Sequence, residues 1–164
     1  MTPAGKQKLR AWIAAALWLG LIAGESTSLG SAENTGRILF PLLHFLMGLD
    51  LSRFEVVHFY IRKSGHFFGY FMLSWLLFRA WKASLSFPGM RWSIQWAGIA
   101  FFMTALVASL DEWHQTFIPG RTGLVSDVVL DSSAAFVAQL VIFLWFRFKN
   151  SSPRNRLGEA SAAD

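Results

Sequence analysis

The chain has 164 residues, of which 54% are hydrophobic and only 15% are charged, and its mean hydropathy is positive. This composition is more apolar than that of a soluble domain of similar length and indicates an integral membrane protein. The absence of cysteine excludes disulfides and thiolate metal sites.

Four continuous apolar segments are predicted to span the membrane: residues 9–24, 54–78, 92–110 and 125–146. Their hydrophobic residues do not alternate with polar ones, which argues against a transmembrane β-barrel. A cleaved signal peptide is the alternative for the first segment, because basic residues precede it and small residues end it.

Residues 25–39 form a polar loop after the first span, in which Asn34 or Thr35 is the expected cap of a short helix. Residues 38–51 are apolar but too short to cross a bilayer, and they contain Pro41. An interfacial or re-entrant helix fits this segment best.

The basic residues predict the orientation in the membrane. With four spans, both termini lie on one side, which holds most of the Lys and Arg residues and only Glu159 and Asp164 as acids. By the positive-inside rule, both termini are cytoplasmic. The formal net charge of +5 therefore reflects topology and contact with anionic membrane lipids, and no nucleic-acid binding is expected.

These features predict an all-α fold, an integral membrane four-helix bundle with an additional short interfacial or re-entrant helix and both termini cytoplasmic. Residues 1–150 are expected to form the transmembrane domain. Residues 151–164 are polar and rich in small side chains, and we expect them to be a disordered cytoplasmic tail.

Polar side chains recur at helical spacing in three of the four spans. At about 100° per residue, the second span aligns Lys63, His66, Tyr70 and Ser74 in one stripe. The third span places Asp111, Glu112 and Gln115 in the same arc as Thr104, Ala105 and Ala108, and places Trp113 on the opposite face. The fourth aligns Asp127 and Asp131 above the small residues Ala134 and Ala138.

Because the spans alternate in direction, these polar groups all lie near the outer ends of their helices. A charge left alone at membrane depth costs about 2.5 to 3.5 kcal/mol or more, so we expect them to meet in one cavity. The predicted ion pairs are Lys63 with Asp111 or Glu112, and Arg121 with Asp127. Pro119 and Gly120 are expected to form a type II turn that directs Arg121 over the bundle.

Three motifs resemble the VanZ-like membrane proteins, a family named after a teicoplanin-resistance protein: KSGHFFGY at 63–70, DEWHQTFIPGR at 111–121 and SDVVLD at 126–131. The resemblance covers residues 25–146. It implies a multi-pass protein of the bacterial cytoplasmic (inner) membrane, connected with the cell envelope or with antibiotic resistance. Asp131 stands where the family more often has Asn, and Ala134 and Ala138 stand where Gly is usual.

Several functions fit these residues, and the sequence leaves open whether the protein is an enzyme. In an enzyme acting on a lipid phosphate or lipid-linked sugar, Lys63 and Arg121 would hold the phosphate, and Asp111 or Glu112 would be the base. The candidate catalytic residues are Lys63, His66, Asp111, Glu112 and Asp127. The candidate ligand-binding residues are Tyr70, Gln115, Arg121 and Asp131.

A metal-assisted variant would use the same carboxylates with His66 or His114 as ligands for Mg²⁺ or Ca²⁺. Lys63 and Arg121 would compete with such an ion, so we assign no metal and no cofactor from the sequence. The same residues also fit a non-catalytic ligand binder, a small transporter or a structural salt-bridge network. The expected partners are membrane lipids and a lipid-linked envelope precursor, and a homo-oligomer stays open.

Overall fold

The structure is a computed structural model that describes residues 1–85, 87 and 89–150. Over these residues the chain is helical and contains no strand, which confirms the all-α prediction. The elements are α1 (Pro3–Ser26), the 3-10 helix η1 (Ser28–Gly30), α2 (Ala32–Met47), α3 (Leu51–Ser84), α4 (Ile94–Gln115) and α5 (Val125–Asn150). The expected disordered tail, residues 151–164, lies outside the described residues.

Three of the described helices, α1, α4 and α5, are long and apolar enough to cross a membrane. The structure extends the second expected span, residues 54–78, to all 34 residues of α3, about 50 Å at 1.5 Å per residue. Helix α3 is less apolar than these three, because it carries charged side chains in both halves, among them Arg62, Lys63, Arg79 and Lys82, together with other polar side chains. A fourth span therefore stays a prediction.

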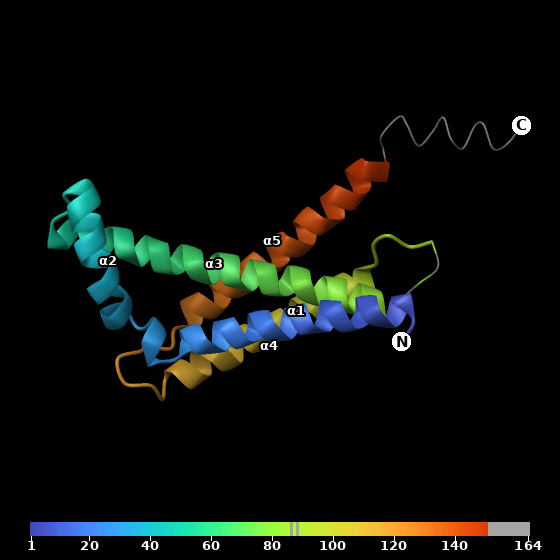
Figure 1. The fold of residues 1–164 in the computed structure, drawn as a ribbon, viewed down its shortest axis with the longest axis horizontal. Coiled ribbons are helices and arrows are strands. Elements are labelled where there is room, and N and C mark those ends of the chain that lie inside the picture. Colours follow the sequence, from blue (N-terminus) through green and yellow to red (C-terminus); the bar gives the residue numbers. More distant parts are fainter. Residues whose placement is uncertain (86, 88, 151–164) are drawn as a thin grey trace, which may run out of the picture.

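Helix α3 is nevertheless the centre of the bundle, because it packs against α1, α4 and α5 (Figure 1). Indole groups fasten α1 to it at two levels. Trp18 Nε1 donates a hydrogen bond to the Gly69 carbonyl at 2.8 Å, and Trp12 Nε1 donates to Ser84 Oγ at 2.9 Å. The half of the bundle near the N-terminus has an apolar core that includes Phe78, Trp96 and Ile142.

Helix α2 lies beside the end of α3 that projects past the other helices (Figure 1). It begins earlier than expected, because the hydroxyl of Ser31 accepts the Asn34 N–H and caps it. The prediction that Asn34 or Thr35 caps this helix is therefore wrong. None of its residues is buried, and Phe45 is 86% exposed. An apolar, exposed surface of this kind supports an interfacial location, which remains a prediction.

Small side chains bring α3 and α5 close together, as the sequence predicted. Ala134 and Ala138 are completely buried. Two hydrogen bonds join the helices at this level. Ser74 Oγ of α3 donates to the Ala135 carbonyl of α5 at 3.2 Å, and Gln139 Nε2 of α5 donates to Ser74 Oγ at 2.7 Å. This close contact sets the spacing of the polar side chains that lie nearer the start of α5.

Candidate functional site

The predicted polar residues gather at one end of the bundle, where α1 and α4 end and α5 begins (Figure 1). We call this the polar end. The predicted faces are correct: Tyr70, Thr104 and Ala108 are buried, whereas Trp113 on the far side of α4 is 64% exposed. Helical periodicity thus placed the polar stripes towards the interior of the bundle.

Lys63 forms an ion pair with Asp127, which links α3 to the first turn of α5. The predicted pairing of Lys63 with Asp111 or Glu112 is wrong, because both of those carboxylates have other partners. The Lys63 side chain is 26% exposed and that of Asp127 is 13% exposed. The pair therefore lies at the rim of the polar end.

Asp111 is held by neutral donors. The Tyr70 hydroxyl donates to Asp111 Oδ2 at 2.8 Å across the α3–α4 interface, and Gln115 Nε2 donates to the same oxygen at 3.2 Å. The site thus brings Asp111 together with Tyr70 and Gln115 rather than with a cation.

Glu112 is positioned by the loop between α4 and α5. Its Oε2 accepts the Leu124 N–H at 2.9 Å. The loop passes so close that a Cβ on Gly123 would lie 2.2 Å from the Glu112 carbonyl oxygen. Only glycine fits there, and it allows Leu124 to reach the carboxylate.

Among the described residues, Arg121 forms no ion pair with a carboxylate, so the predicted pair with Asp127 is wrong. The expected turn before it is present, since Gly120 has a φ of 77° and the Arg121 N–H donates to the Ile118 carbonyl at 3.1 Å. The turn directs the Arg121 guanidinium to the segment after α1. There it donates to the carbonyls of Gly30, at 2.7 Å, and Glu25.

Arg62 belongs to the polar end but is not among the site residues predicted from the sequence. Its Nη1 donates to the Gly30 carbonyl at 2.6 Å, so the guanidiniums of Arg62 and Arg121 share one acceptor. Arg62 lies one residue, and about 100°, from the Lys63 stripe, and periodicity alone gave no reason to choose it. The only feature of the sequence that pointed to Arg62 is its position directly before Lys63, the first residue of the motif at 63–70.

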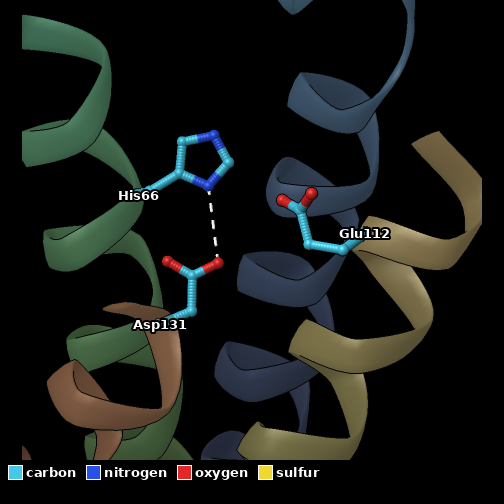
Figure 2. A group of neighbouring side chains, drawn as sticks. All are labelled: His66, Glu112 and Asp131. Carbon is cyan, nitrogen blue, oxygen red and sulfur yellow. Dashed lines mark ion pairs between the residues drawn. The ribbon is translucent and has the colours of Figure 1, made fainter. Parts of the chain in front are cut away.

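Three side chains from three helices converge beneath the rim: His66 from α3, Glu112 from α4 and Asp131 from α5 (Figure 2). Asp131 is completely buried, and its Oδ2 lies 3.5 Å from His66 Nδ1. By contrast, His114 is exposed and is not part of this group. The polar end thus combines a carboxylate-rich interior with basic residues nearer the rim.

Residues 11–147 match the sequence model of the VanZ/LLP1 family. The chain belongs to this family. The resemblance seen in the three motifs is therefore confirmed, and with its long apolar helices the chain is a VanZ-like membrane protein. No curated protein and no solved structure matches it.

The two tyrosines provide a matched test of this VanZ-like site. Tyr70→Phe should lower the free energy of unfolding by about 1.5 to 3 kcal/mol, because the Asp111 carboxylate loses a hydrogen-bond donor. Tyr60→Phe removes a hydroxyl from a side chain that is 65% exposed and should change it by less than about 0.5 kcal/mol. Unfolding in mixed detergent measures both, and equal changes would contradict the geometry.

Proposed function

We propose that the polar end faces the outside of the bacterial cytoplasmic membrane and binds a phosphate-bearing envelope ligand such as a lipid-linked precursor. The observation that carries the proposal is the shared contact of Arg62 and Arg121 with the Gly30 carbonyl. Two like charges held at one neutral oxygen repel each other, and an anion beside them would relieve that repulsion.

Neither guanidinium has its charge neutralised by a direct contact. Among the described residues, neither Arg62 nor Arg121 forms an ion pair with a carboxylate, and the buried Nε of Arg121 has no hydrogen-bond partner. A guanidinium offers several donors in a planar fork that matches phosphate oxygens. The unused donor of Arg121 supports phosphate as the ligand.

The remaining predicted residues take supporting roles in this proposal. Lys63 is partly exposed and its charge is balanced by Asp127, so in this proposal it contacts the phosphate only by giving up that carboxylate. If the ligand is chemically changed, Asp111 or Glu112 is the candidate base and His66 a second acid or base. Binding without chemistry, or transport, uses the same cationic rim.

A structural role for the two arginines is the competing interpretation, because their hydrogen bonds also fasten η1 to the bundle. The backbone at Gly30 packs so closely against the end of α1 that a Cβ there would lie 2.1 Å from the Glu25 carbonyl oxygen, which fits a structural role for this segment. A purely structural role does not require a phosphate-bearing ligand. Ligand binding therefore separates the two interpretations.

The proposed orientation has a direct test, since the chain lacks cysteine. Thr122→Cys, in the exposed loop before α5, should react with a membrane-impermeant maleimide in spheroplasts. Gln7→Cys, exposed near the start of α1, should react only after permeabilisation. The reverse labelling pattern would place the polar end in the cytoplasm and contradict the proposal.

Phosphate recognition is tested with polyprenyl phosphate, using the uncharged polyprenol as the control ligand. The phosphate should bind the detergent-solubilised protein at least about tenfold more tightly than the alcohol does, and Arg62→Gln or Arg121→Gln should remove that preference. Arg53→Gln, which changes an exposed arginine paired with Asp50, should retain it. Equal binding of the two lipids to the native chain would contradict the proposal.

Lipid mass spectrometry then distinguishes enzyme from binder. Cells with and without the protein are compared for their lipid-linked phosphates. A chemically altered species supports catalysis by the polar end, whereas an unaltered pool together with selective binding supports a binder or transporter.

A further inference from the structure

His66, Glu112 and Asp131 form a compact group at the meeting point of α3, α4 and α5 (Figure 2). Each offers a ligand atom, and these three atoms all lie within 4.8 Å of one another. The group is defined by tertiary packing, because its members come from three different helices.

Each carboxylate of this group has one oxygen with no partner among the described residues. Asp131 is completely buried. Its Oδ2 forms a long ion pair with His66 Nδ1 at 3.5 Å, and its Oδ1 has no hydrogen-bond partner among the described residues. Glu112 is 3% exposed, and its Oε1 likewise has none in the described part of the chain. One imidazole beside two buried carboxylates leaves excess negative charge when both acids are ionised, and a bound cation would offset it.

The neighbouring cations do not supply it by direct contact. Lys63 pairs with Asp127, while Arg62 and Arg121 donate to backbone carbonyls. The sequence disfavours a metal, because Lys63 and Arg121 are expected in the same pocket and would compete with the ion for the carboxylates. In the structure neither of them forms an ion pair with Glu112 or Asp131, so that objection no longer holds.

We propose that His66, Glu112 and Asp131 bind a divalent transition-metal ion of the Zn²⁺ or Mn²⁺ type. Imidazole nitrogen combined with carboxylate oxygens suits such ions better than Mg²⁺ or Ca²⁺, which prefer oxygen ligands alone. Ligand atoms about 2.1 Å from one ion lie roughly 3 to 4 Å apart, so small side-chain rotations close the site.

The hydrogen bond from the Leu124 N–H to Glu112 Oε2 orients the carboxylate and leaves Oε1 for the ion. Such a supporting contact is typical of metal-binding carboxylates. Three protein ligands leave coordination positions for water or for a ligand oxygen. That the ion also contacts the phosphate of a bound lipid rests on the proposed function, whereas metal binding itself does not.

The native chain, purified in detergent, stripped with a chelator and dialysed, provides the first test. Titration calorimetry with Zn²⁺ and with Mn²⁺, followed by elemental analysis after gel filtration, should give one bound ion per chain for at least one metal. The bound ion should also raise the unfolding temperature. If the native chain retains neither ion, the proposal is overturned, and no variant is needed for that conclusion. The three side chains would then be a group held together by shared protons.

Variants locate the ion. Asp131→Asn and Glu112→Gln should weaken binding by more than about 100-fold, since each removes a charged ligand. Glu33→Gln changes a carboxylate on α2 that is 73% exposed, and it should bind as the native chain does. Equal loss in all three, or no loss in the first two, would show that the ion binds elsewhere and would overturn the proposal.

Lipid binding keeps the two proposals apart. If the native chain distinguishes polyprenyl phosphate from polyprenol but binds no ion, the metal site is wrong and the anion site stands. If it binds one ion through Glu112 and Asp131 but does not distinguish the two lipids, the metal site stands and the proposed phosphate ligand is wrong.

Discussion

The close packing of α3 against α5 is the interaction on which the polar end depends. Ionisable groups at membrane depth are costly, and they become tolerable only when their helices approach closely enough for the groups to meet. Ala134 and Ala138 permit that approach, and the buried hydrogen bond between Gln139 and Ser74 holds it. The ion pair of Lys63 with Asp127 lies along the same interface.

The polar end is divided by charge, and that division gives it two chemistries. Near the rim, Arg62 and Arg121 are cationic groups whose partners are neutral carbonyls. Deeper inside, Glu112 and Asp131 are carboxylates with free oxygens next to an imidazole. In a purely structural salt-bridge network, the two arginines would form ion pairs with these carboxylates. Their separation is what supports an anionic ligand at one place and a cation at the other.

Sequence periodicity predicted which faces of the helices are buried but not which side chains would pair. The positions of Tyr70 and Ala138 follow from the 3.6-residue repeat, because each helix has only one face that can meet its neighbours. Pairing depends on the axial offset between helices and on the path of the loops. Lys63 therefore pairs with Asp127 rather than with a carboxylate of α4. The turn before Arg121 directs its guanidinium to the Gly30 carbonyl, and helical periodicity cannot predict either contact.

Exchanging the charges of Lys63 and Asp127 tests the contact between α3 and α5 most directly. The abundance of each variant in the membrane and its unfolding temperature are measured. Lys63→Asp and Asp127→Lys should each be destabilising, because each places two like charges together at the rim. The double variant should recover about half or more of the lost stability, since it restores an ion pair with reversed polarity. Losses in the double variant equal to the sum of the single losses, or rescue of Lys63→Asp by Asp111→Lys instead, would contradict the account.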